Sequence, residues 1–517
     1  MPAASFCSNK DHVGPVPNDS SAVPPYKISC MKHPAQFFLR KEMEMLAAVV
    51  PFRSPSRTSG MALSRSLPAD HKERHDAGKT LRERIPRLQH EKWAPAPDRR
   101  DPVSLILESG IGRIQELLPI RYGRMMVSPF TFYRGTAGIM AADLAQMPVS
   151  GLHAQICGDC HLMNLGGFAT AERRLIFDIN DFDETLPGPW EWDVKRLAAS
   201  FVLACRSNGF ATADQRDAAL TCVRSYREHM RKYSGAPALE IWYANVDSTD
   251  VLASVRNKDS RDRLRKRIQK EQKRETTEHD FPAMAAQKEG GYVIKENPPL
   301  IYHYPLINLE SNRANIQQGL ARYRSSLEDD RKILLDRYHL MDLSLKVVGI
   351  GSVGTLCCIA LMVAAKDDHL FLQIKEAHPS VLERYAGRSK YANHGERVVT
   401  GQRLMQSASD IFLGWTHGKA GRHFYIRQLR DMKIKPLVDV FDPATMMDYA
   451  VLCGWTLARA HARSADPAMI AGYMGKSDVF DRAITGFAVS YADQAERDHA
   501  RFKHAIRIGK IGVERET

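Results

Sequence analysis

One short stretch of the chain, residues 155–193, constrains its fold and its chemistry more than any other. It reads QICGDCHLMNLGGFATAERRLIFDINDFDETLPGPWEWD and contains two apolar runs typical of strands, each followed by acidic or amide side chains. These side chains are Asp159, His161, Asn164, Asp178, Asp181 and Asp183. A base, an amide oxygen and further carboxylates on neighbouring strand ends are the groups that phosphoryl transfer from a magnesium nucleotide requires.

The spacing within this stretch resembles that of a known group of enzymes. Kinase catalytic loops place the catalytic aspartate five residues before a metal-binding asparagine, and Asp159 stands five residues before Asn164. Aminoglycoside and choline kinase-like enzymes write the loop as HGDxHxxN, followed by IDFxD and later by D-[LVI]-A. Residues 157–164 (CGDCHLMN), 180–183 (NDFD) and 193–198 (DVKRLA) resemble these motifs in order and spacing. The first residue departs from them, because it is a cysteine where the group has histidine.

The resemblance implies a role for each of four residues. Asp159 would be the base that accepts the proton of an acceptor hydroxyl group. Asn164 and Asp181 would be the ligands of magnesium. Asp193 would be a structural carboxylate that braces the catalytic loop.

The other polar side chains of the stretch have less sharply defined roles. We expect Asp178 and Asp183 to assist the metal ion or the acceptor. We expect His161 to shape the loop through a backbone hydrogen bond, with a direct catalytic part as the alternative. Acidic loop residues are often merely solvated, but several such groups at matched offsets behind two apolar runs favour a functional site.

A glycine-rich motif supplies the groups that phosphates need. Residues 347–355 (VVGIGSVGT) contain G-x-G-x-x-G at Gly349, Gly351 and Gly354, and Lys375 lies on a later apolar run. Glycines let backbone amides approach phosphates closely, and a lysine on such a strand pairs with the α- and β-phosphates. The same pattern can open a dinucleotide-binding unit, but the apolar run that follows predicts a strand and not a helix. We therefore predict a kinase-like small lobe that binds ATP.

Kinase-like small lobes hold their lysine with a glutamate from a following helix. Glu396 stands at a suitable distance after Lys375 and precedes a helical pattern of apolar residues. We expect Glu396 to pair with Lys375, with Glu383 as the alternative.

The order of the two motifs is unusual, because the catalytic loop precedes the glycine loop. Circular permutation explains this order, and permutation is tolerated where chain termini lie close together at the surface. Residues 424–429 (FYIRQL) then read as the strand that reaches the hinge. Residues 449–463 (YAVLCGWTLARAHAR) read as the large-lobe helix that leads into the catalytic loop in unpermuted relatives.

From about Arg82 to about Phe502 the chain resembles the bacterial domain-of-unknown-function family 2252, which is grouped with kinase-like proteins. The stretches that carry this resemblance are RYGRMMVSPFTFYRG at 121–135, QICGDCHLMNLGGF at 155–168, FDINDFDET at 177–185, VVGIGSVGT at 347–355 and LQIKEAHPSVLERY at 372–385. The family supports the fold more than the substrate. Arg134, in the first of these stretches, is equally suited to a phosphate and to a carboxylate of the fold.

These motifs predict an α+β chain with a two-lobed, circularly permuted, protein-kinase-like fold. We expect a flexible basic arm over residues 1–78 and the catalytic half of the large lobe, with helical additions, over 79–340. The small lobe, with the glycine loop and the lysine strand, covers 341–432. The helical remainder of the large lobe covers 433–517.

Composition limits the partners. The net charge of +13 and the pI of about 9.2 suggest an anionic partner, but about half of the excess lies in the first hundred residues. The basic run at 260–277 lacks interleaved aromatic residues, so nucleic acid is not favoured. The uncharged stretch 347–365 is long enough to span a bilayer, yet its glycines favour two buried strands around a loop.

Cysteine usage and the absence of an evident signal peptide favour the cytoplasm. Nine cysteines in 517 residues do not form a disulfide framework. Cys157 and Cys160 form one C-x-x-C pair, but no second pair completes a zinc site, so two small semi-buried residues are the favoured interpretation.

We expect an ATP- and magnesium-dependent phosphotransferase that acts on a hydroxyl acceptor, with a small molecule favoured by analogy. A nucleotidyl transferase on the same fold is one alternative, since it uses the same metals with the nucleotide reversed. A non-catalytic nucleotide-binding scaffold is the other. The sequence predicts neither the acceptor nor the oligomeric state.

Overall fold

The computed structural model describes residues 70–273, 281, 283–288, 291–366, 368–429 and 433–514. The described residues belong to one compact unit. Most of the expected arm lies outside the described residues, but its last part does not, because helix α2 covers His71–Arg84. Asp70 begins this helix with a capping box that includes Glu73, and α2 packs against α18 (Pro467–Met474).

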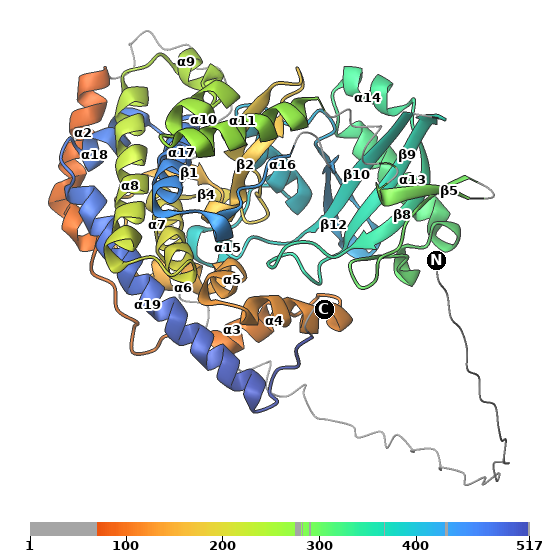
Figure 1. Cartoon of the computed structure of the whole chain (residues 1–517), viewed down its shortest axis with the longest axis horizontal. Helices are drawn as coiled ribbons and strands as arrows, with labels where there is room; N and C mark the ends of the chain where they lie inside the picture. Colours follow the sequence, from red (N-terminus) through yellow and green to blue (C-terminus); the bar gives the residue numbers. More distant parts are fainter. Residues whose placement is uncertain are drawn as a thin grey trace, which may run out of the picture. The chain divides into compact units, whose positions relative to one another are not determined.

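Four long helices form the main helical core. They are α7 (Trp190–Ser207), α8 (Thr212–Ser234), α17 (Pro443–Ala462) and α19 (Val479–Arg507). Helix α17 packs on α8, and α19 packs on α7, so distant parts of the chain share one core (Figure 1). The expected helix over 449–463 is therefore confirmed as part of α17.

Six described strands form the main sheet, in the order β11-β12-β10-β9-β8-β7 with antiparallel neighbours. They are β7 (Ile301–Tyr302), β8 (His339–Lys346), β9 (Cys357–Ala365), β10 (Asp368–Ala377), β11 (Gly414–His417) and β12 (His423–Gln428). The glycine motif lies between β8 and β9, as predicted. Strand β7 joins from before residue 341, so the sheet begins earlier along the chain than expected.

The uncharged stretch 347–365 was expected to form two buried strands around a loop. It forms the glycine loop and one buried strand, β9, because the strand before the loop, β8, already ends at Lys346. Among the described residues, no helix combines the length and the apolar character that crossing a bilayer requires. The arrangement of helices and sheets confirms the α+β class.

Two small antiparallel sheets carry the acidic stretch. Strand β1 (His153–Ile156) pairs with β4 (Leu186–Pro189), and β2 (Leu165–Ala169) pairs with β3 (Leu175–Ile179). Gly167 in β2 also exchanges two backbone hydrogen bonds with Ile434, at 2.8 and 2.9 Å. A Cβ on the neighbouring Gly166 would lie 2.8 Å from the Ile434 carbonyl oxygen, so this close approach requires glycine.

Four short helices precede the acidic stretch and lie beside the glycine loop. They are α3 (Pro102–Glu108), α4 (Leu118–Met126), α5 (Pro129–Arg134) and α6 (Ala137–Leu144). Each of α3, α4 and α5 has proline in its first turn, where the missing amide hydrogen costs no hydrogen bond. Ile350 of the glycine loop shares an apolar cluster with these helices and with Phe502 of α19.

The remaining described elements surround this framework. The helices are α9 (Ala238–Tyr243), α10 (Ser248–Ser254), α11 (Lys258–Gln272), α13 (Leu309–Ser325), α14 (Asp329–Leu335), α15 (Glu383–Ala386) and α16 (His394–Met405). Strands β5 (Ala285–Lys288) and β6 (Gly291–Ile294) form a separate antiparallel pair.

Candidate functional site

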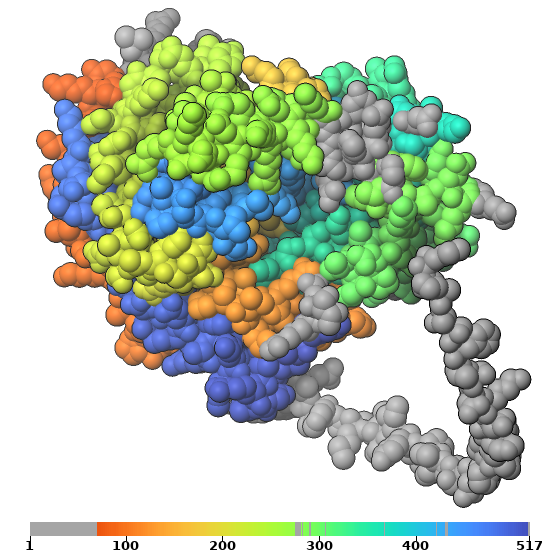
Figure 2. All heavy atoms as spheres, in the orientation of Figure 1, coloured from red at the N-terminus to blue at the C-terminus, as the bar shows by residue number. Residues whose placement is uncertain are grey.

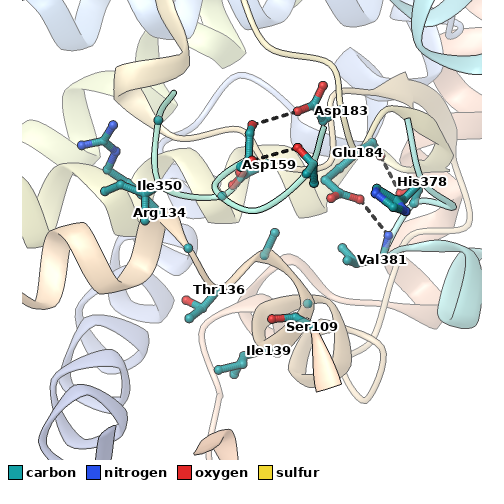
Figure 3. A pocket seen from close by; sticks show the side chains of 18 of the residues that line it. Ser109, Arg134, Thr136, Ile139, Asp159, Asp183, Glu184, Ile350, His378 and Val381 are labelled. Atoms are coloured by element: carbon teal, nitrogen blue, oxygen red, sulfur yellow. Dashed lines mark hydrogen bonds between the residues drawn. The ribbon is translucent and has the colours of Figure 1, made fainter. Parts of the chain in front are cut away.

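A cavity of about 460 Å³ lies where the acidic loops, the glycine loop and the short N-terminal helices meet. In Figure 2 the orange N-terminal helices and the teal sheet adjoin at the surface, and Figure 3 shows the cavity itself. The cavity brings together predicted residues from both motifs. Those that line it are Asp159, His161, Asn164, Asp181, Asp183, Gly349 and Gly351.

The loop that carries Asp159 is held by a side chain of α7. The Asp193 carboxylate accepts hydrogen bonds from the backbone amides of Cys157, at 2.7 Å, and Gly158, at 2.9 Å. His461 of α17 places Nε2 3.3 Å from the same carboxylate. Gly158 has a φ of +77°, which only glycine adopts without strain. Asp193 therefore occupies the bracing position that the resemblance implied.

Asp159 pairs with a buried arginine that the sequence did not single out. Arg196 Nε donates to Asp159 Oδ1 at 2.6 Å, and its guanidinium lies 4.4 Å from the Tyr133 ring centroid. Burial raises the pKa of Asp159 to about 7 against the opposing effect of Arg196, and Asp181 and Glu184 raise it further. A carboxylate with such a pKa is suited to act as a base near neutral pH.

Backbone hydrogen bonds fold the loop tightly around Asp159. The His161 amide donates to the Asp159 carbonyl at 2.9 Å, and the Asn164 amide donates to the His161 carbonyl at 2.8 Å. Burial, with nearby Arg134 and Arg196, lowers the pKa of His161, so the ring is neutral at pH 7. These hydrogen bonds are made by the backbone of His161, while its buried Nδ1 has no hydrogen-bond partner among the described residues, so the role of the His161 side chain stays a prediction.

The Asn164 side chain is oriented by its amide nitrogen, which donates to the Asp159 carbonyl at 2.8 Å. No described group donates to its amide oxygen, and the residue lines the cavity. Oxygen ligands of this kind suit magnesium. Asn164 is therefore free to offer its oxygen to a ligand.

Asp183 joins the acidic stretch to the sheet. Its Oδ2 accepts from Lys375 Nζ at 2.7 Å and from Ser352 Oγ at 3.2 Å, and its Oδ1 accepts from Tyr425 at 2.6 Å. Burial acts to raise the pKa of Asp183, but Lys375 and Tyr425 outweigh it and lower the pKa to about 2. Asp181 is more exposed, and its Oδ1 lies 3.9 Å from Lys375 Nζ.

Lys375 does not pair with Glu396, contrary to the prediction. Lys375 lies opposite Tyr425 in the β10–β12 register, and its carboxylate partners are Asp183 and Asp181. Glu396 lies in the first turn of α16, where its amide donates to the Asn393 side chain. The next residue of that helix, Arg397, is the one turned toward the site. It donates to the backbone carbonyls of Asp183, at 2.8 Å, and Thr185, at 2.7 Å.

The other candidate, Glu383, also does not pair with Lys375. It lies 3.7 Å from His394 and 4.0 Å from Arg397. Neither glutamate is therefore a candidate for the nucleotide site. The acidic residues Asp183 and Asp181 take the place of the expected glutamate as partners of Lys375.

Asp178 has a structural role and not the metal-binding role that was expected. It is fully buried, forms an ion pair with Arg459 of α17, and accepts from both the amide and the hydroxyl of Ser407 at 2.9 Å. It does not line the cavity. Since its charge is already compensated by arginine, Asp178 is removed from the candidate metal set.

The glycine loop is held from outside by the N-terminal helices. Arg124 donates to the Gly349 carbonyl at 2.5 Å, and Arg113 donates to the carbonyls of Gly351, at 2.7 Å, and Val353, at 2.6 Å. The Gly354 carbonyl accepts from the Ile114 amide at 2.7 Å. Among the described residues, no acceptor binds the amides of residues 349–352, which suits them to an anion.

The conformation of this loop depends on two of its glycines. Gly349 and Gly354 have φ values of +66° and +87°. Gly354 does not line the cavity, so its part is to turn the chain into β9. No motif in the sequence predicted that Arg113 and Arg124 would anchor this loop.

The C-x-x-C pair matches its structural interpretation. Cys157 and Cys160 are fully buried, and burial raises the pKa of both thiols. Together with Asp193 they form a group of potential metal ligands among the described residues. Both oxygens of Asp193 already accept amide hydrogens, and a structural zinc site takes four ligands.

Comparison with known proteins gives one match. A family described as "Uncharacterized protein conserved in bacteria (DUF2252)" matches residues 113–505. No curated protein and no solved structure matches significantly. The matched region contains both loops, the six-stranded sheet, helices α7, α8 and α17, and all but the last two residues of α19. Because the match covers most of the chain, the protein belongs to this bacterial DUF2252 family.

Proposed function

We propose that the protein is an ATP- and magnesium-dependent phosphotransferase with a circularly permuted, kinase-like arrangement. The observation that carries the proposal is the convergence of two motifs. The acidic loops and the glycine loop line one cavity, although the Ser352–Asp183 hydrogen bond that joins them spans 169 residues of chain.

The order of elements in the sheet supports the permutation. Strand β8, the glycine loop, β9 and β10 with Lys375 follow one another, and helix α16 and strands β11 and β12 come next. The chain after β12 then pairs with β2 through Ile434 and continues into α17. Helix α17 reaches the catalytic loop through His461 and Asp193. A large-lobe helix is thus adjacent to a catalytic loop that precedes it in sequence.

The nucleotide phosphates would be bound first by the amides of residues 349–352, which have no described acceptor. Lys375 is already paired with Asp183 and Asp181, so it would add its positive charge from behind these carboxylates. Magnesium fits Asn164 and Asp181, since one offers a free amide oxygen and the other a partly exposed carboxylate. When bound, the metal would neutralise charge on the phosphates. Asp183 is held by Lys375 and Tyr425, so it acts first as the link between the loops.

Asp159 is the proposed base. Its carboxylate faces the cavity, and Arg196 and the loop hydrogen bonds hold it in place. A pKa near 7 lets it accept the proton of an acceptor hydroxyl as that oxygen attacks phosphorus. The fixed carboxylate also orients the hydroxyl, which matters because phosphoryl transfer depends mainly on position and charge.

The test is calorimetric binding of ATP, with and without magnesium, to the full chain and to Asp181→Asn. We expect magnesium-dependent binding that weakens about tenfold or more in the variant, because a metal ligand is lost. Asp262→Asn, a surface change of equal charge, is the control. Absence of nucleotide binding by the unaltered protein would refute the proposal. Mass spectrometry of a labelled product would then separate phosphoryl from nucleotidyl transfer.

A further inference from the structure

Three arginines from one segment of the chain line the cavity beside the acidic loops. They are Arg113, Arg121 and Arg134, and we call them the arginine wall. Figure 3 shows Arg134 at one side of the cavity and Asp183, Glu184 and His378 at the other. None of the three arginines forms an ion pair with a carboxylate among the described residues.

Arg121 is a buried cation without a counter-ion. Its side chain is 1% exposed, and it donates to the Ser109 hydroxyl at 2.9 Å and to the Gly135 carbonyl at 3.2 Å. Its Nε has no acceptor. Burial and the nearby Arg113 lower its pKa to about 9. Burying an uncompensated charge is costly, so a site that keeps one is poised to receive an anion.

Arg134 makes the fewest hydrogen bonds of the three arginines. No described group accepts a hydrogen bond from its guanidinium, and its Nε is buried without an acceptor. It lies near enough to Asp159 and Asp439 for their charges to act on its pKa, which burial lowers. It also acts on the pKa of His161. Its charge therefore acts on the proposed base, to which no described hydrogen bond or ion pair joins it.

We propose that the arginine wall binds an anionic group of the acceptor substrate, a phosphate or a carboxylate, and that the acceptor hydroxyl then faces Asp159. This inference rests on the proposed function. The amides of residues 349–352 already provide for the nucleotide phosphates, so the wall is available to the second substrate. Arginine suits this task, because its planar guanidinium binds carboxylate and phosphate groups through two parallel hydrogen bonds. The cavity volume of about 460 Å³ suits a small metabolite.

The test uses inorganic phosphate and acetate as probes of the wall. Binding of each probe to the full chain is measured by calorimetry, with magnesium and a non-hydrolysable ATP analogue present and again without nucleotide. The variant is Arg134→Gln, which breaks no described hydrogen bond and should fold normally. The control is Arg216→Gln on the exposed face of α8, which changes the net charge equally. Circular dichroism checks that each variant is folded.

We expect phosphate or acetate to bind alongside the nucleotide and to weaken about tenfold in Arg134→Gln, because a charge-assisted contact is lost. Nucleotide affinity should stay the same in both variants. Tighter binding of phosphate would assign a phosphate ester as acceptor, and equal or tighter binding of acetate would assign a carboxylic acid.

Two outcomes would overturn the inference. One is probe affinity that Arg134→Gln leaves unchanged. The other is competition between probe and nucleotide together with weaker nucleotide binding by Arg134→Gln, which would place the wall in the nucleotide site. The measurements without nucleotide keep the tests distinct, because the wall is still probed if the proposed nucleotide binding fails.

Discussion

The side chains of Lys375 and Asp183 meet across 192 residues of chain, with Nζ 2.7 Å from Oδ2. Lys375 belongs to strand β10 of the main sheet, and Asp183 follows strand β3 of a small sheet. The lysine is 3% exposed, and its ammonium lies 5.2 Å from the centroid of the Tyr425 ring. The pair therefore fastens the acidic loop to the sheet while it also shapes the candidate site.

The first prediction concerns the stability that this pair contributes. Lys375→Met should reduce the free energy of unfolding by about 1–3 kcal/mol, because the Asp183 carboxylate, whose side chain is 30% exposed, loses its cation. The double variant Lys375→Met with Asp183→Asn should recover part of the loss. Urea denaturation measures both. Lys332→Met removes an ion pair of the same 2.7 Å distance at the surface and should change stability little. Equal losses for Lys375→Met and Lys332→Met would contradict the prediction.

The second prediction concerns pH. The pKa of Asp159 is about 7 in the folded protein, above its ordinary value of about 3.9. Between these values the folded state binds more protons, so the contribution of Asp159 to stability is full below about pH 4 and declines as pH rises to about 7.

Asp159→Asn cannot ionise and should lose this part of the pH dependence. Urea denaturation at about pH 5 and about pH 8 should show the variant gaining stability relative to the unaltered protein at the higher pH. A stability difference that is the same at both values would count against the raised pKa.

Much of the candidate site was predictable because its signals are local. Asp159 and Asn164 lie five residues apart in one short loop. Gly349 and Gly354 adopt positive φ values, which favour glycine. The apolar runs after the glycine motif and around Lys375 predicted strands β9 and β10, whereas β8 was not predicted at its place. Local patterns of this kind depend on few other parts of the chain.

The remaining assignments depended on distant partners. Asp178 lies in strand β3 and Asp181 follows that strand, yet only the structure shows that Arg459, 281 residues away from Asp178, pairs with the Asp178 carboxylate. The prediction for Glu396 was wrong for a related reason. The side chain of α16 that reaches the acidic stretch is that of Arg397, which donates to the backbone carbonyls of Asp183 and Thr185. The arginines that anchor the glycine loop likewise come from a segment more than two hundred residues earlier. Sequence spacing carries no information on such pairings.

The third prediction concerns the brace under the catalytic loop. Asp193→Asn keeps the shape of the side chain but replaces one oxygen with an amide nitrogen, which cannot accept from the Cys157 or Gly158 amide. We expect a loss of about 2–3 kcal/mol in the free energy of unfolding, since a hydrogen bond to a buried charge is removed. Asp214→Asn at the start of α8 is the matched control. A loss no greater than that of the control would show that the brace contributes little.

The fourth prediction concerns the contact between α17 and α8, which positions α17 beside the loop that carries Asp159. Gly454 of α17 lies against α8 so closely that a Cβ would stand 2.2 Å from the Cys222 carbonyl oxygen. Gly454→Ala must therefore separate the two helices, and the loss of stability should be several kcal/mol, at or above the about 1–3 kcal/mol typical of overpacking.

Gly319 of α13 gives the matched control, because no atom lies within 4 Å of a Cβ added there. Gly319→Ala should raise the free energy of unfolding by about 0.5–1 kcal/mol, since alanine loses less backbone entropy in a helix than glycine does. Because helix α17 carries His461 to Asp193, Gly454→Ala should also weaken magnesium–ATP binding, which Gly319→Ala should leave unchanged. If Gly454→Ala proved as stable as Gly319→Ala, the close packing of α17 on α8, and with it the support for the catalytic loop, would be wrong.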